Sequence, residues 1–346
     1  MKARVIGMGV LLLAGCGGGA AEPGDRDVPR IHAHAGPFRP LRESELSERS
    51  GVAPYPLESS AREFREPSAL DLAQRGRPGR CALYAVARIA GVTGVFRFIA
   101  PEARSFTPDP DPARAILVPE LDWEGDWVGA PSAHRVGTQV WLLYAAAGGI
   151  GLARSSDGIE FVREPSPVLA TDTDVEWEGG LAPNAPSFLQ VSDHDFRLYY
   201  SVNGRIGEAR SRDGMTWQRD GDRPLLVPAS EFAESSAPDE AAVEDPHALL
   251  ARSMEGRTVT RIYYTAVASD GSSSVGLAAR YGTEGPLERA VSPVFVSARS
   301  PHAPWVLPFD EFALLFVTQQ AGATAGLDFP AIAMGVTPPS ISLSVR

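Results

Sequence analysis

The sequence predicts an all-β fold, a five-bladed β-propeller that follows an N-terminal signal segment and a flexible linker. The main observation is a short phrase, X-Pro-(Ser/His)-(Ala/Phe), which occurs five times with its prolines 55 to 64 residues apart. Apolar and aromatic strand patterns follow each copy, and a repeat of this length with several strands is typical of a propeller blade. The five copies begin at Glu66, Ala130, Ala185, Asp245 and Ser300.

Each repeat contains alternating apolar segments of strand length after its phrase. In chain order these segments are 83–87 and 95–99, 140–144 and 150–153, 196–200 and 206–209, 262–266 and 275–278, and finally 312–317, after which the pattern decays. Two repeats also contain a Ser-x-Asp-Gly sequence, in which the glycine favours a hairpin turn and the serine can bond the turn backbone. Asp157 and Asp213 are therefore predicted to be turn residues rather than reactive groups.

Residues 1–15 are predicted to be a signal peptide. Lys2 and Arg4 precede an apolar run that is too short to span a bilayer as a helix. The run ends in Leu13-Ala14-Gly15-Cys16, which resembles the lipobox of bacterial lipoproteins. This resemblance implies cleavage before Cys16 and lipidation of its thiol, and hence a membrane anchor at the bacterial outer membrane or cell surface, with the periplasmic face as an alternative. An ordinary secretory signal with a chance cysteine is the other interpretation.

The rest of the chain is expected to form one domain after a linker. Residues 16–50 are rich in Gly, Pro, Arg and Glu and lack apolar periodicity, which predicts a lipidated N-terminus and flexible linker. Residues 51–346 are assigned to the propeller. Cys81 lies in a strand-like run and is expected to be a small buried hydrophobic residue.

Composition and charge limit the classes of partner. The formal net charge of the whole chain is −11. An acidic protein of this kind is unsuited to nucleic acid, which requires basic patches over its phosphates. No sequence motif indicates a cofactor, so none is expected.

Carboxylates occupy the X position or its neighbour in two of the five phrases. They are Glu66 in the first copy and the pair Glu244-Asp245 in the fourth. If the phrases line a common axial channel, these groups would be costly to bury unless they are used or paired. Arg65 and Arg299 are candidate partners, so structural ion pairs around the channel are one interpretation. The prolines are expected at the starts of strands, where no ladder donor is needed.

A family resemblance rests on these phrases and on the strands behind them. The sequence 243–246 (Val-Glu-Asp-Pro) ahead of strands 262–266 and 275–278 resembles family 130 glycoside phosphorylases and hydrolases. The preceding repeat, with Asn184-Ala185-Pro186 and the turn 211–214, resembles the preceding blade of that family. Glycoside hydrolase family 43, in the wider superfamily of five-bladed furanosidases, shares this layout. The resemblance covers about residues 120–300 and implies a five-bladed propeller that acts on carbohydrate.

The resemblance also implies roles for individual residues. Asp245 matches the general acid of family 130, Glu244 the acidic residue before it, and Asn184 a sugar-contacting asparagine. In the family 43 layout Glu244 would instead be the general acid, and Glu66 would stand where the base begins blade one. An inverting glycosidase needs a carboxylic acid that protonates the leaving oxygen and a carboxylate about 6.5–9.5 Å away that activates water.

Several departures from the family patterns are visible. His247 stands where family 130 continues with arginine, and Ala185 replaces the blade-three aspartate of family 43. Lys2 is the only lysine of the chain and would be removed with the signal peptide, so phosphorolysis would lack its usual lysine. The Glu-Asp-Pro phrase also lies in the fourth repeat, although in family 130 it comes early. These differences are compatible with a permuted or a degenerate relative.

Histidines and tryptophans near the phrases complete the candidate site. His134, His247 and His302 follow the phrase in three repeats, where they could contact sugar hydroxyls, bind a metal or serve structure alone; no metal site is assigned. Trp127, Trp177 and Trp305 lie near the phrases and are candidate platforms for sugar rings, with core packing as the alternative for each.

Three functions remain open from the sequence. The first is an inverting, hydrolase-like glycoside-cleaving enzyme, with Asp245 or Glu244 as acid and Glu66 as base. The second is a glycan-binding propeller without catalysis, and the third is a protein-interaction scaffold. The expected partners are carbohydrate and, through the lipid anchor, a membrane.

Overall fold

The computed structural model describes residues 35–40, 62–72, 80–100, 106–231, 240–253, 256–309, 312–320 and 331–336. Cys16, the predicted signal peptide and most of the predicted linker lie outside these residues, so the structure does not test them. In the part of the chain that the structure describes, no helix is long and apolar enough to cross a membrane.

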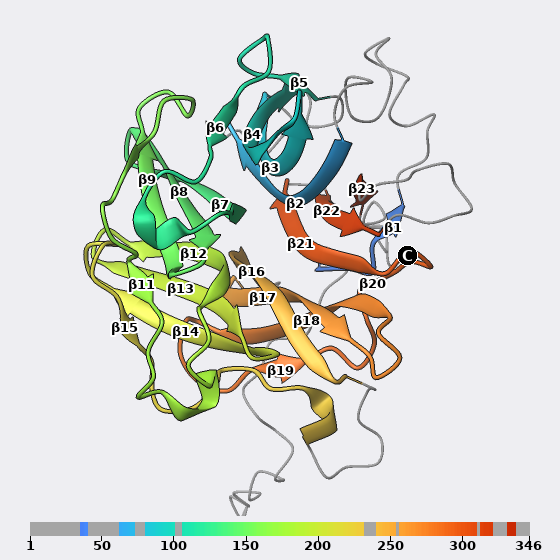
Figure 1. Ribbon diagram of the computed structural model, residues 1–346. Helices are drawn as coiled ribbons and strands as arrows, with labels where there is room; N and C mark the ends of the chain where they lie inside the picture. The colour runs from blue at the N-terminus through green and yellow to red at the C-terminus, as the bar shows by residue number, and fades with distance from the viewer. Residues whose placement is uncertain are drawn as a thin grey trace, which may run out of the picture.

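The described residues form a β-propeller of five antiparallel sheets (Figure 1). The inner strand of each sheet carries one copy of the repeated phrase. These inner strands are β2 (Arg62–Asp71), β7 (Val128–Val136), β12 (Asn184–Ser192), β16 (Ala242–Arg252) and β21 (Pro301–Pro308). Their partners, the second strands, are β3 (Cys81–Ile89), β8 (Gln139–Ala146), β13 (Asp195–Val202), β17 (Thr258–Val267) and β22 (Ala313–Gln319).

The third and outer strands complete the sheets. The third strands are β4 (Val92–Ala100), β9 (Gly149–Ser155), β14 (Arg205–Ser211), β18 (Ser273–Tyr281) and β23 (Ala331–Val336). Outside them lie β5 (Thr107–Pro108), β6 (Ala115–Leu117), β10 (Val162–Arg163), β11 (Leu169–Ala170), β15 (Gln218–Arg219), β19 (Glu288–Arg289), β20 (Phe295–Val296) and β1 (Arg39–Pro40). The strand segments expected from the sequence fall within these strands, except that the segment 312–317 begins one residue before β22.

Four of the sheets are blades formed by one continuous stretch of chain each, which is one fewer than the five blades that the repeats predict. Blade one contains β2–β6, blade two β7–β11, blade three β12–β15 and blade four β16–β20. The remaining sheet, here called the mixed sheet, joins β21–β23 from the C-terminal side to β1 from the N-terminal side. The fifth repeat thus takes its outermost strand from the other end of the chain.

Every inner strand contains a β-bulge with an X-Pro pair; the prolines of the first four phrases therefore lie inside their strands, which corrects the expectation that they begin them, whereas Pro301 of the fifth phrase does begin β21. In each sheet the inner strand has one residue more than its partner strand over the bulge. In blade two, for example, Gly129 pairs with Ala145 and Ser132 with Leu143. The bulge contains the X residue and its proline, and X has a positive φ of 44° to 57°. Proline is tolerated at a bulge because the extra residue donates nothing to the ladder.

The bulges correct the assignment of the fifth phrase. In β21 the bulge lies between His302 and Trp305, so Ala303-Pro304 takes the place that Asp245-Pro246 takes in β16. Ala303 has a φ of 48°. The sequence predicted Ser300-Pro301 instead, because its letters match the phrase. The bulge of β21 therefore lies three residues after the phrase that the sequence predicted.

Hydrogen bonds between neighbouring inner strands hold the sheets in a ring. The side chain of the residue that follows each bulge proline forms a hydrogen bond with the backbone of the next sheet. Its partner is the residue two positions after the proline of that next sheet. Ser68, Ser132 and Ser187 accept from the N–H groups of Ala133, Phe188 and Ala248 at 2.8, 3.3 and 2.8 Å. His247 Nε2 lies 3.0 Å from the carbonyl oxygen of Val306, and Trp305 Nε1 donates to the carbonyl of Ala69 at 2.8 Å. The last bond joins the mixed sheet to blade one and closes the ring.

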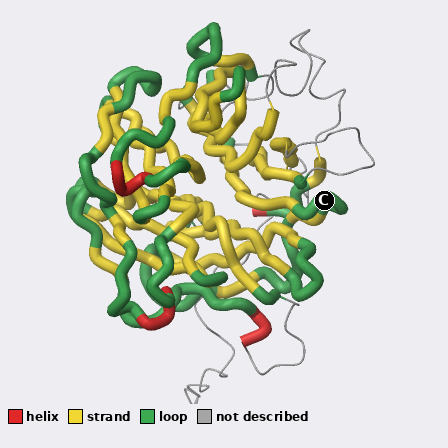
Figure 2. Tube along the Cα trace, in the orientation of Figure 1, coloured by secondary structure: helices red, strands yellow, loops and turns green. Residues whose placement is uncertain are grey.

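The core lies between the sheets and consists of apolar side chains from the first three strands of each. Tyr84, Phe96, Tyr144, Phe188 and Phe316 are fully buried there. Short 3-10 turns lie in the loops and include η2 (Asp122–Glu124), η3 (Glu176–Glu178) and η4 (Ala229–Glu231) (Figure 2). Cys81 is buried, as expected.

Blades two, three and four each contain a buried glutamate, tyrosine and arginine in equivalent places. The tyrosine lies on the second strand, donates its hydroxyl to the glutamate, and the arginine of the outer strand pairs with the same carboxylate. The three sets are Glu124, Tyr144 and Arg163; Glu178, Tyr200 and Arg219; and Glu240, Tyr264 and Arg289. Because carboxylate and guanidinium are both paired, the cost of burying their charges is offset.

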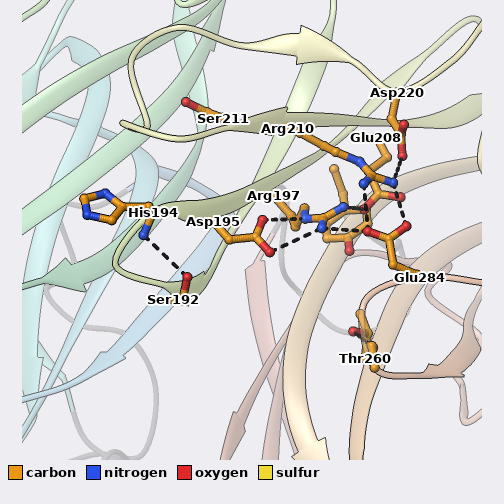
Figure 3. Close-up of polar contacts among 12 residues, drawn as sticks. Ser192, His194, Asp195, Arg197, Glu208, Arg210, Ser211, Asp220, Thr260 and Glu284 are labelled. Atoms are coloured by element: carbon orange, nitrogen blue, oxygen red, sulfur yellow. Dashed lines mark hydrogen bonds and ion pairs between the residues drawn. The ribbon is translucent and has the colours of Figure 1, made fainter.

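A larger ionic cluster connects blade three to blade four (Figure 3). Glu284, in the turn between β18 and β19, accepts from Arg197 and Arg210 at 2.8 and 2.7 Å. Beneath it, Arg280 donates to Glu208 at 2.7 Å. Charges of both signs are interleaved, so the cluster joins the two blades through ion pairs.

Candidate functional site

The five bulges surround a small pocket on the propeller axis, here called the axial pocket. Its volume is about 70 Å³. Since a water molecule needs roughly 10–15 Å³ of such space, it holds a few waters or the edge of one sugar ring. The lining consists of Glu66-Pro67, Ala130-Pro131, Ala185-Pro186, Asp245-Pro246 and Ala303-Pro304, together with Asn184 and Trp305.

The backbone N–H of each X residue is hydrogen-bonded, which fixes the ring of bulges. Three of the five bonds go to a hydroxyl on the second strand of the preceding sheet. Asp245 donates to Ser201 Oγ at 2.7 Å, Ala303 to Thr265 Oγ1 at 3.0 Å and Glu66 to Thr318 Oγ1 at 2.8 Å. The other two use a carboxylate and an amide: Ala130 donates to Glu66 Oε2 at 2.6 Å and Ala185 to Asn184 Oδ1 at 2.6 Å.

Glu66 is half-buried at the pocket and is held at both carboxylate oxygens. Oε2 accepts the bond from Ala130, and Oε1 forms an ion pair with Arg65. Burial raises the pKa of Glu66 above its ordinary value; the charge of Arg65 and the Ala130 bond oppose this, and the charge of Asp245 adds to it. The predicted partnership of Arg65 with Glu66 is confirmed.

Asp245 lies across the same pocket from a different blade. Its Oδ2 accepts from the Thr265 hydroxyl at 2.9 Å and from the N–H of Ala303 at 3.2 Å. These two donors fix the carboxylate at the pocket wall. Glu66 and Asp245 are the two carboxylates among the lining residues, and they influence each other electrostatically.

Glu244 is beside the pocket but does not line it. It pairs with Thr265 in the ladder and is half-buried. Burial, followed by the charge of Asp245, raises the pKa of its carboxyl group. A raised carboxyl pKa is the property that a proton donor in a hydrolase requires. Asn184 occupies the equivalent place in β12, and its side chain does line the pocket.

The three candidate histidines lie in different surroundings. His302 directly precedes Ala303, the X residue of the β21 bulge. Its Nε2 atom is 3.1 Å from Gln320 Nε2 and 3.4 Å from Ser273 Oγ. His247 and His134 lie below the pocket, with ring centroids 4.1 and 5.5 Å from that of Trp305. Burial lowers the pKa of both to about 3, so both are neutral. No group of three or more His, Cys, Asp or Glu residues suited to a metal occurs within the described ranges.

The three candidate tryptophans also separate in space. Trp305 forms part of the pocket wall. It follows the bulge proline Pro304, as His247 follows Pro246 in blade four. Trp127 is 39% exposed and directly precedes β7. Trp177 lies in η3 and stacks on Tyr200 at 6.1 Å, so it packs in blade three and does not line the axial pocket.

Sequence reasoning missed the groups that position the acids. Thr265 and Thr318 are the hydroxyls that fix Asp245 and Glu66, and Gly129 leaves room for the Glu66 carboxylate. A signal was available, because Ser201, Thr265 and Thr318 occupy the same position in three equivalent strands. It could be found only by aligning the second strands with the bulged inner strands.

No protein-family model matches the chain, and no curated protein matches its sequence. Solved structures do share its fold. A thermostable family-43 glycoside hydrolase is 16% identical with a TM-score of 0.58, over 81% of this chain and 90% of that chain. A glycosyl hydrolase from Bacteroides ovatus is 12% identical with a TM-score of 0.60, over 89% and 96%.

A third structure comes from the GH130 family of mannoside phosphorylases, which contains glycoside hydrolases that target β-1,2 mannosidic linkages in Candida mannan. It is 12% identical with a TM-score of 0.60, over 89% of this chain and 96% of that chain. At such identities the likeness establishes the β-propeller fold found in glycoside hydrolases. It agrees with the two families that the repeated phrases resemble.

Proposed function

We propose that this protein is a glycoside-cleaving enzyme whose site is the axial pocket. The observation that carries the proposal is that Glu66 and Asp245, from the first and fourth blades, line one pocket and are each fixed by hydrogen bonds. The fold shared with family 43 and family 130 structures supports it. The ring of five X-Pro bulges also leads us to propose that the mixed sheet acts as a fifth blade.

The proposed reaction is hydrolysis with inversion. Glu66 would accept a proton from water as the water attacks the anomeric carbon, and a carboxyl group of blade four would donate a proton to the leaving glycosidic oxygen. Asp245 lines the pocket, whereas Glu244 has the raised pKa that a proton donor needs. The acid is therefore one of these two residues, and their variants distinguish them.

The test is turnover of aryl-glycosides and oligosaccharides by the parent protein and by Glu66→Gln, Asp245→Asn and Glu244→Gln. Loss of the general acid should slow substrates with poor leaving groups by about 10²–10⁴-fold, and activated aryl-glycosides much less. Loss of the base should slow both kinds of substrate. Turnover that all three variants retain at the parent rate would refute the proposal.

A second candidate function is glycan binding without catalysis. Three of the five ring positions are alanines, Ala130, Ala185 and Ala303, so the pocket lacks the third acid that family 43 would supply at Ala185. In that case oligosaccharides should bind the parent protein and no variant should differ from it in turnover. Absence of both turnover and oligosaccharide binding would favour the protein-interaction scaffold.

We further propose that Cys16 is lipidated and that the linker 16–50 holds the propeller at a membrane surface. The motif Leu13-Ala14-Gly15-Cys16 supports this proposal. Mass spectrometry of the mature N-terminus tests it: a diacylated or triacylated Cys16 is expected, and a free thiol there would refute it.

A further inference from the structure

The buried glutamate-tyrosine-arginine sets of blades two and three share a fourth member. The residue before the glutamate is a tryptophan, and its ring stacks on the tyrosine. Trp123 and Tyr144 have ring centroids 5.9 Å apart with an interplanar angle of 28°. Trp177 and Tyr200 repeat this arrangement at 6.1 Å and 28°. In these two blades an indole therefore covers the tyrosine.

Blade four has the same tyrosine but lacks the indole. The residue before Glu240 is Asp239 in the sequence, and no aromatic ring of the described residues stacks on Tyr264. A pocket of about 290 Å³ lies there instead, here called the blade-four pocket. Its lining includes Glu240, Tyr264, Ser272, Ser274, Val291 and Val296. This volume is close to the lower limit of about 300 Å³ for small-molecule sites, whereas the axial pocket is far below it.

The lining matches the chemistry of an uncharged sugar. Val291 and Val296 are 94% and 66% exposed and offer apolar surface to the C–H face of a ring. The hydroxyls of Ser272 and Ser274 can exchange hydrogen bonds with those of a sugar. Glu240 is already paired with Arg289 and with the Tyr264 hydroxyl, so its charge is balanced within the protein. The pocket thus has no unbalanced charge that would select an ion.

The two pockets are lined by residues that lie close together along the strands of blade four. Glu244, beside the axial pocket, pairs with Thr265, and Ala266 of the blade-four pocket is the next residue along β17. Ser273, another lining residue, donates to the carbonyl of Pro301 at 2.9 Å and lies 3.4 Å from His302 Nε2. His302 directly precedes the ring residue Ala303. A short bonded path therefore connects the blade-four pocket to the rim of the axial pocket.

We propose that the blade-four pocket is a second carbohydrate site, which binds one neutral sugar residue in the place that an indole fills in blades two and three. The choice of carbohydrate rests on the proposed function, in which the end of a glycan occupies the axial pocket. A residue farther along the same oligosaccharide would then lie over Tyr264.

The test is calorimetric binding of neutral di- to hexasaccharides of pentoses and hexoses to the full-length protein carrying Glu66→Gln and Asp245→Asn. In this background turnover is blocked, whereas the amide side chains still allow sugar to bind at the axial pocket, so the contribution of the blade-four pocket is read from the difference in affinity between variants. Ser274→Trp should fill the pocket with an indole and weaken binding by at least about tenfold, and Val296→Asp should act in the same direction through a different change. Val162→Asp is the matched control, because Val162 is 74% exposed on an outer strand of blade two.

The result expected is saturable binding that Ser274→Trp and Val296→Asp weaken and Val162→Asp leaves unchanged, with near-UV circular dichroism confirming that all variants are folded. Equal affinities in all variants, or no binding by any sugar of the panel, would overturn the proposal. N-acetyltryptophanamide serves as a competitor; if it binds and no sugar does, the ligand is an aromatic side chain and the carbohydrate assignment fails. Turnover of aryl-glycosides by the parent protein is measured separately, so a failure of the proposed function is distinguished from a failure of this one.

Discussion

Gly129 leaves the space that the Glu66 carboxylate occupies. A Cβ atom at position 129 would lie 2.7 Å from Glu66 Oε2, which is closer than real Cβ atoms approach. The backbone of Gly129 does not have a positive φ, so another residue could adopt its conformation. The glycine therefore matters here for the space it leaves rather than for its flexibility.

Gly129→Ala should consequently displace the Glu66 carboxylate from its bond with Ala130 and reduce turnover by about tenfold or more, since small misplacements of a catalytic group are costly. Thermal stability should fall only slightly. Gly137→Ala is the control: Gly137 has a φ of 58° and open space around its Cβ position, so it should lose about 1 kcal/mol of stability and keep its turnover. Equal turnover in the two variants would contradict this role for Gly129.

At the scale of single elements, the bulged inner strand carries the site and the outer strands hold the blade. The bulge turns the X residue into the positive-φ region and places it at the pocket. The guanidinium of the outer strand reaches back under the sheet to the buried glutamate, as Arg219 does to Glu178. Glu178 is fully buried, so its charge depends on that partner.

Arg219→Met should destabilise the protein by about 3–5 kcal/mol, because it leaves a buried carboxylate without its counterion. Urea denaturation measures this loss. Arg114→Met is the matched control, since the ion pair of Arg114 with Glu160 is exposed on both sides and should contribute less than about 1 kcal/mol. Equal destabilisation in the two variants would show that burial of Glu178 does not set the energy.

At the scale of the whole molecule, the closed ring buries two neutral histidines below the axial pocket. The pKa of His134 and His247 is lowered to about 3, mainly by burial, with the charge of His247 adding to the effect on His134. In the unfolded chain their pKa would be about 6.5. Between these values the unfolded chain binds protons that the folded chain does not. The free energy of unfolding should therefore decrease as the pH falls from about 6.5 toward about 3.

His247→Gln should flatten this decrease, because an amide keeps a donor for the Val306 carbonyl and does not titrate. The free energy of unfolding is measured between pH 5 and 6.5, above the range in which carboxylates such as Asp213, with a pKa lowered to about 2 by backbone N–H donors, lose their stabilising charge. His194→Gln is the control for the substitution itself, since His194 is exposed in a turn. An equal slope in the parent and in His247→Gln would contradict this interpretation.

Much of the fold is predictable from local pattern. The second and third strands follow alternating apolar residues, and the Ser-x-Asp-Gly turns form as expected: Gly158 donates to Ser155 Oγ at 2.8 Å and Gly214 to Ser211 Oγ at 2.8 Å. The place of Glu66 and Asp245 at one pocket was also expected, because repetition puts equivalent residues around one axis. The fifth phrase was misplaced by three residues, since Ser300-Pro301 matches in letters while the bulge forms at Ala303-Pro304.

The sequence by itself determined the β-propeller class, the strands and the acids on the axis, because these depend on periodicity and on repetition along the chain. The tertiary structure alone decided the origin of the β1 edge strand, the fixing of the acids by Thr265, Thr318 and Gly129, and the opening over Tyr264. The physical reason is that these features arise between sheets, where residues far apart in sequence fill or leave space, and no local pattern encodes that space.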